Sequence, residues 1–202
     1  MINQNVSTHE KYPDPYHGIY ARTVFGFWLF LLTDFVLFGV LFACFAVLRD
    51  GTFGGPGAKE LFDIDFAIMQ SCILLLCSFL SGLAGAAAHR RDKKHVIIFF
   101  ALTFLLGLLF MGYEYADFAR LMESGNSWKR SAFLSAFFTL LGTHGIHVIF
   151  GLLWIPVLLY PVIKEGIDQD GIRRISCLRL FWQFLNIVWV FIFAIVYFMG
   201  RG

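Results

Sequence analysis

The sequence predicts an all-α integral membrane protein with five transmembrane helices. Of its 202 residues, 58% are hydrophobic and only 15% are charged, and the mean hydropathy is +0.71. A soluble domain carries about 25% charged residues. A soluble chain of this size would still expose about a third of its unfolded surface, so it could not hide so much apolar area. This composition excludes a disordered chain, a secreted disulfide module and a soluble nucleic-acid-binding domain.

Five apolar runs are long enough to cross a bilayer, whose hydrocarbon core requires about 20 helical residues. None alternates polar and apolar residues as the strands of a membrane barrel do. Helices satisfy their backbone groups internally, which lipid requires. We therefore predict helices at about 24–48, 66–88, 96–123, 131–163 and 178–199. Residues 1–23 are expected to form a polar N-terminal tail, and residues 24–202 a single membrane domain without internal repeats.

The third and fourth helices are expected to extend beyond the hydrocarbon. Polar side chains recur every third residue near the end of the third helix, which predicts a stripe facing solvent; they are Glu114, Asp117, Arg120 and Glu123. The fourth run exceeds the bilayer thickness at 1.5 Å per residue. Pro156 and Pro161 are expected to kink it.

The distribution of basic residues predicts the orientation. Of the 16 Lys and Arg residues, ten lie on the N-terminal side of the predicted spans and six on the opposite side. The short loop Arg90-Arg91-Asp92-Lys93-Lys94 carries the strongest single signal. The positive-inside rule then predicts a cytoplasmic N-terminus and a periplasmic C-terminus. The net charge of +2 is too small to favour a polyanionic partner, so we expect no nucleic acid to bind.

Asp34 is predicted to lie near the middle of the membrane, where an ionisable group suggests function. Its helical neighbours at three and four positions are apolar, namely Phe30, Leu31, Leu37 and Phe38. Either another helix supplies a partner or the carboxyl is protonated, because apolar surroundings disfavour its charged form. Both a proton-active or lipid-facing carboxyl and an interhelical hydrogen bond remain open.

Glu114 is the second carboxyl within the predicted spans, and it is expected near the outer interface. One interpretation is an interfacial acid capped by Trp128, Lys129 or Arg130. The other is a polar contact with a partner subunit or with lipid.

His144 and His147 share one helix face because they are three residues apart. Two histidines and a glutamate could bind a metal, but we expect Glu114 to lie about 10 Å or more farther out at 1.5 Å per residue. Histidines on one helix also cannot ligate a haem from both sides. We therefore predict no metal or haem in this chain.

Small and polar side chains recur every fourth residue along the fourth helix, which is typical of close helix packing in lipid. They are Ser131, Ser135, Thr139, Thr143, His147 and Gly151, and the second helix offers a matching face of Ser71, Ser78, Gly82 and Gly85. In the last helix Gln183 and Asn186 share a face. We expect each to make an interhelical hydrogen bond worth about 0.6 kcal/mol.

Several strings in the sequence resemble the haem–copper oxidase subunit III family in its five-helix form. Residues 25–29 (FGFWL) and 33–38 (TDFVLF) resemble the first helix of that family. Residues 133–138 (FLSAFF) and 142–148 (GTHGIHV) resemble its most specific motif, and residues 181–189 (FWQFLNIVW) its final helix. The resemblance extends from Phe25 to the C-terminus and is closest to members found in ubiquinol oxidases.

The resemblance implies a non-catalytic subunit of a proton-pumping terminal oxidase in a bacterial inner membrane. Haem, copper and quinol would belong to the partner subunits, which are expected to be subunits I, II and IV. The helices would form a cleft that holds phospholipid, and Asp34 falls at the family's intramembrane carboxyl. Gln183 and Asn186 replace the usual His and Asp, which favours a structural role there.

Three other functions stay open. The first is subunit III of a cytochrome c oxidase, although those commonly carry two additional N-terminal helices. The second is a relative associated with nitric oxide reductase. The third, a small channel or transporter, is disfavoured because the chain lacks related repeats.

Overall fold

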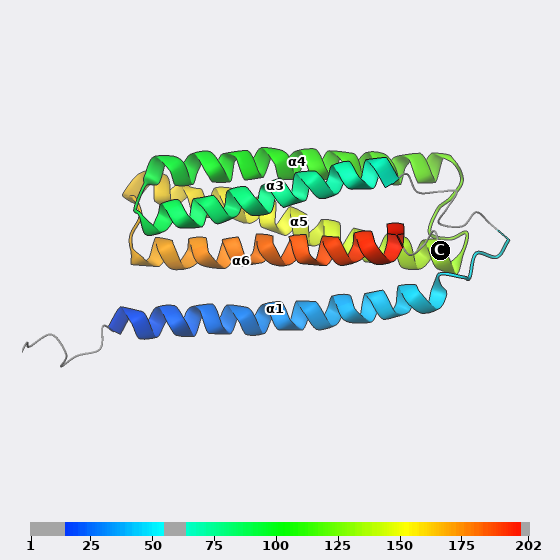
Figure 1. Cartoon of the computed structure of the whole chain (residues 1–202), viewed down its shortest axis with the longest axis horizontal. Helices are drawn as coiled ribbons and strands as arrows, with labels where there is room; N and C mark the ends of the chain where they lie inside the picture. Colours follow the sequence, from blue (N-terminus) through cyan, green and yellow to red (C-terminus); the bar gives the residue numbers. More distant parts are fainter. Residues whose placement is uncertain (1–14, 55–63, 199–202) are drawn as a thin grey trace, which may run out of the picture.

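The computed structural model describes residues 15–54 and 64–198, which form five long helices (Figure 1). These are α1 (Pro15–Leu48), α3 (Ile64–His89), α4 (Lys93–Glu123), α5 (Ala132–Glu165) and α6 (Gln169–Ile192), and a π-helical turn η2 (Phe193–Phe198) continues α6. All five are long and apolar enough to cross a membrane. The prediction of an all-helical chain with five such helices is confirmed within the described residues.

Four helices begin before their apolar runs, α3 and α4 by two or three residues and α1 and α6 by more than two turns. α1 begins at Pro15 rather than at residue 24, so part of the predicted tail is helical. Residues 1–14 and the predicted helix end at 199 lie outside the described residues. α6 begins at Gln169 rather than at residue 178, because the Asp168 carboxylate accepts a hydrogen bond from the Gly171 backbone N–H at 2.6 Å. A polar side chain at this position caps a helix and allows it to start before the apolar segment.

Local sequence explains the ends of α5. The Ser131 hydroxyl accepts a hydrogen bond from the Leu134 N–H at 3.1 Å and caps the first turn. Gly166 ends the helix with φ +90°, a conformation that glycine adopts without steric cost. Between them the helix continues through Pro156 and Pro161.

Helices α3, α4, α5 and α6 form one block, and α1 lies along its side against α5 and α6 (Figure 1). α3 packs chiefly against α4 and α6. The expected match between the small face of α3 and α5 is therefore wrong. The small face meets α6 instead, where Ser71 accepts a hydrogen bond from the Trp189 indole at 2.9 Å and Gly85 leaves room for Arg179.

α4 buries one face along its whole length. The buried residues alternate spacings of four and three, which is the pattern of a helix seam; they are Val96, Phe100, Thr103, Gly107, Phe110, Glu114, Asp117 and Leu121. The predicted solvent-facing stripe is therefore wrong for Glu114 and Asp117. A spacing of three residues occurs along a buried face of a helix as well as along an exposed one. Here Glu114 and Asp117 continue the buried apolar seam. Arg120 is exposed and donates a hydrogen bond to the Asp117 carboxylate at 2.9 Å.

The polar stripe of α5 is only partly a packing surface within this chain. Gly151 and half-buried His147 face neighbouring helices, whereas Ser131 caps α5 itself and Ser135 and Thr139 are exposed. Thr139 and Thr143 donate their hydroxyl hydrogens to carbonyls of their own helix at 2.7 Å each. These hydroxyls therefore do not join α5 to another helix.

Candidate functional site

The first polar pair of the candidate site joins α1 to α5. Asp34 lies on the buried seam of α1, with 9% of its surface exposed. The Nε2 atom of His147 lies 3.8 Å from Asp34 Oδ2, which is within ion-pair range but too long for a hydrogen bond. His147 Nδ1 lies 2.8 Å from the Thr143 carbonyl oxygen. Because a carbonyl only accepts, Nδ1 carries the hydrogen and Nε2 is left to face Asp34.

His144 is enclosed by aromatic rings one turn before His147. Its exposed fraction is zero, and its ring lies 5.3 Å from Trp189, 5.9 Å from Phe110 and 6.4 Å from Phe38, centroid to centroid. Nε2 lies 3.3 Å from the Leu185 carbonyl oxygen of α6. Nε2 therefore carries the hydrogen, while Nδ1 is buried without a partner.

Glu114 is buried, with 2% of its surface exposed, and neither carboxyl oxygen has a hydrogen-bond partner. It lies against Gly145 of α5, where an added Cβ would come within 3.1 Å of Oε1. The expected depth difference between Glu114 and the two histidines is therefore wrong. A depth counted along each helix separately does not include the register between α4 and α5, which their packing sets.

The expected cap on Glu114 is also wrong. Lys129 lies over the Trp128 ring at 6.0 Å, and Arg130 donates to the Asn126 side chain at 2.5 Å. Trp128, Lys129 and Arg130 belong to the loop after α4 and are exposed. The loop leaves the helix more than one turn beyond Glu114, so it cannot cover a residue on the core face.

Gln183 and Asn186 lie half-buried on α6. Neither makes a hydrogen bond to another helix within the part of the chain that the structure describes, and Asn186 Oδ1 is buried without a partner. Their expected interhelical bonds are absent there, and a contact with a neighbouring subunit stays a prediction. The bond that does join α6 to α3 comes from the Trp189 indole. No sequence pattern indicates Trp189, although its partner Ser71 lies on the predicted packing face.

No group of three or more His, Cys, Asp or Glu side chains that could hold a metal occurs in residues 15–54 and 64–198. The two histidines instead face in different directions, His147 toward α1 and His144 toward α6.

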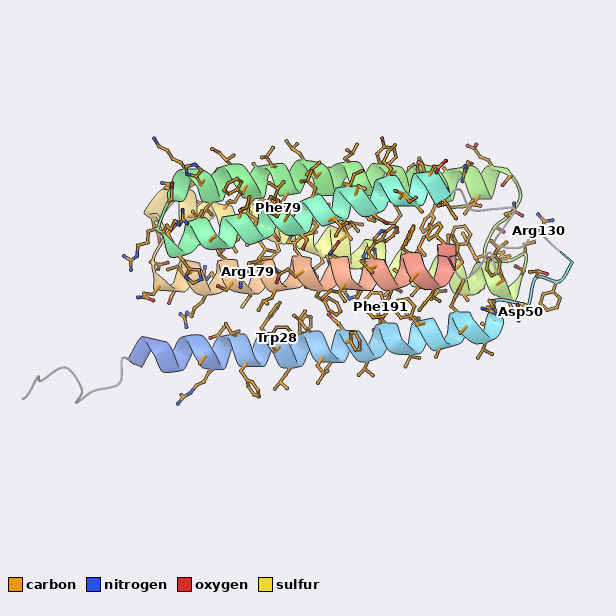
Figure 2. The ribbon with its side chains drawn as sticks, viewed as in Figure 1. Trp28, Asp50, Phe79, Arg130, Arg179 and Phe191 are labelled. Carbon is orange, nitrogen blue, oxygen red and sulfur yellow. The ribbon has the colours of Figure 1, made fainter. Side chains whose placement is uncertain are left out.

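Aromatic side chains such as Phe42 and Phe191 pack between α1 and α6 (Figure 2). Two cavities lie along α1. One cavity, of about 500 Å³, lies beside the N-terminal half of α1. Its other lining residues include Trp154, Asp170, Arg173 and Arg174. The other, of about 430 Å³, is almost wholly apolar and is lined by residues of α1 and α6, including Trp28, Phe35 and Phe184. Arg173 donates a hydrogen bond to the Asp170 carboxylate, so among the described residues Arg174 supplies the unpaired positive charge of this rim. A positively charged rim beside an apolar groove suits a molecule with an anionic head and hydrocarbon chains.

These features define a multi-pass membrane protein with buried polar pairs and an amphiphilic groove. The family model for cytochrome c oxidase subunit III matches residues 16–201. The chain belongs to that family, and the resemblance predicted from its motifs is confirmed.

Relatives in the family serve different oxidases. The chain is 46% identical to the cytochrome bo(3) ubiquinol oxidase subunit 3 of Pseudomonas aeruginosa, over 93% of this chain and 90% of the relative. It is 41% identical to the quinol oxidase subunit 3 of Bacillus subtilis, over 89% and 88% of the two chains. It is 43% identical to the cytochrome c oxidase subunit 3 of Bacillus sp. (strain PS3), over 87% and 84%.

Proposed function

We propose that this chain is the non-catalytic subunit III of a proton-translocating ubiquinol oxidase in a bacterial inner membrane. The observation that supports this proposal most strongly is the 46% identity of the chain to a ubiquinol oxidase subunit 3, over almost the full length of both chains. Its role is to stabilise subunit I and to hold lipid, within a complex that also includes subunits II and IV. Haem, copper and quinol belong to those partners.

A cytochrome c oxidase is the second candidate, because a relative that is 43% identical carries that name. The electron donor binds to other subunits, so the intact complex decides between the two. We expect an affinity tag on this chain to retrieve a haem- and copper-containing complex that consumes oxygen with ubiquinol. Consumption with reduced cytochrome c and not with ubiquinol would assign the chain to the second candidate.

Replacing His144 and His147 together with Asn should leave haem and copper per complex unchanged.

The proposed orientation has the N-terminus in the cytoplasm and the C-terminus in the periplasm. It is supported by the ten-to-six division of Lys and Arg. We expect an alkaline phosphatase fused after Gly202 to be active, because that enzyme folds only outside the cytoplasm. A fluorescent reporter that folds only in the cytoplasm should be dark at the same position. The reverse result would invert all five spans.

The proposed lipid is an anionic phospholipid lying along α1. Arg173 and Arg174 line the cavity beside Trp154, and the apolar cavity lies farther along the same helix. A guanidinium group binds a phosphate through two parallel hydrogen bonds. An apolar groove beside it offers the acyl chains protein contacts on both sides.

Replacing Arg173 and Arg174 together with Ala should therefore remove phospholipid from the purified complex. We expect native mass spectrometry to record fewer lipids per complex than in the wild type. Lys94→Ala is the matched control, because Lys94 is an exposed cation at the same end of the bundle and lies outside the cavity. An equal lipid content in the double variant and in the wild type would contradict this assignment.

A further inference from the structure

Two buried groups with complementary hydrogen-bonding needs lie at one level of the α4–α5 interface. His144 donates through Nε2 to the Leu185 carbonyl, which leaves Nδ1 as an acceptor without a partner. Glu114 has two buried oxygens without a partner. A protonated carboxyl offers one O–H donor, and an unprotonated imidazole nitrogen accepts one. Buried polar groups in native proteins are almost always satisfied, so each needs a group of the kind that the other offers.

The packing brings these groups to neighbouring positions. Glu114 contacts Gly145, which directly follows His144 in the chain. Phe110, one turn before Glu114 on α4, meets the His144 ring edge-on at 5.9 Å. Gly145 has no side chain, and this leaves the carboxyl its place against the α5 backbone.

The other charged groups nearby are engaged elsewhere. On α4, Arg120 donates to Asp117 at 2.9 Å. On α1 and α5, Asp34 and His147 face each other. On η2, Tyr197 is buried, and its hydroxyl does not bond to Glu114, because neither oxygen of that carboxyl has a hydrogen-bond partner among the described residues. No described cation is paired with Glu114, which makes a neutral, proton-sharing arrangement the favourable one at membrane depth.

We propose that Glu114 and His144 form a buried carboxyl–imidazole couple that shares one proton through one enclosed water molecule. The couple lies across α4 and α5, whereas Asp34 and His147 lie across α1 and α5. One turn of α5 thus carries two such arrangements, which face different helices. This inference goes beyond the proposed function, because it assigns a partner to each of two groups that the oxidase chemistry does not use.

A double-mutant cycle on the assembled complex tests the proposal. Glu114→Met removes the donor, and His144→Phe removes the acceptor while keeping an aromatic ring. Each change should lower the temperature at which half of this subunit is lost from the complex. The double variant should lose no more than the more harmful single variant, because its partner group is already gone. Glu114→Gln keeps a donor and should remain closer to the wild type.

The control cycle pairs Glu114→Met with His147→Phe, whose effects should add. Additive losses for Glu114 and His144 would overturn the proposal. A density map of the wild-type complex provides a second test that requires no variant. Density for one water between the Glu114 carboxyl and His144 Nδ1 supports the couple. A side chain from a neighbouring subunit bound to the Glu114 carboxyl refutes it.

Discussion

Replacing Gly107 with Leu is expected to prevent this chain from packing into a stable bundle. A Cβ at this position would lie 2.7 Å from Leu152 Cδ2 and 3.0 Å from the Trp182 ring. Both neighbours are buried, Trp182 with only 1% of its surface exposed. Overpacking a full core costs about 1–3 kcal/mol and sometimes more. Leucine would force α4 away from α5 and α6 together, so we expect the upper end of that range or beyond.

The measurement is the amount of folded chain that resists proteolysis in isolated membranes. Gly112→Leu is the matched control on the same helix, because nothing lies within 4 Å of a Cβ at Gly112 and the residue is exposed. It should resist proteolysis like the wild type. Equal amounts of both variants would show that the close approach of α4 at Gly107 does not limit stability.

A hydrophobic carbodiimide is expected to label Asp34, and Asp34→Asn should abolish the labelling completely. Such reagents react with protonated carboxyls that they reach from the lipid. Asp34 lies on the peripheral helix α1 with 9% of its surface exposed, against 2% for Glu114, and only the Oδ2 atom of Asp34 is enclosed without a partner. Both oxygens of Glu114 are enclosed. The label, detected by mass spectrometry of peptides, should therefore remain at Asp34 in Glu114→Gln.

Oxygen consumption should distinguish two roles for Asp34. If the redox centres lie in the partner subunits, Asp34→Asn should retain most of the initial turnover in a fully assembled complex. A modest change in proton pumping or in the lifetime of activity is compatible with this expectation. Complete loss of turnover with assembly intact would place Asp34 on an obligatory proton path.

Hydropathy predicted the five helices because each long apolar run has only one way to satisfy its backbone in lipid. It missed the first turns of α6, since these are polar and depend on the cap at Asp168. The sequence also indicated Asp34 and His147 as polar groups in apolar runs, but not that they face each other. Which helix lies beside α1 is a property of tertiary packing, and local patterns do not contain it.

Glu114 illustrates a different limit. Its spacing from Phe110 and Gly107 follows the buried seam of α4, so its burial could have been predicted from that pattern. The spacing of Glu114 from Asp117, Arg120 and Glu123 indicates a solvent-facing stripe instead. Glu114 and Asp117 belong to both patterns, so the sequence alone does not decide between them. Its contact with Gly145 depends on how far α4 slides along α5, which the close approach of Gly107 to Leu152 determines.

The position of α1 also has a consequence for biosynthesis. α3 and α4 are consecutive and pack closely, so they can pair soon after both have entered the membrane. Among the described helices, α1 leaves the ribosome before the others, yet its neighbours α5 and α6 are made after α3 and α4. Until then its buried seam, with Asp34 at the centre, faces lipid or an insertion factor. α1 can therefore dock only after α5 has been made, and only then does Asp34 meet His147.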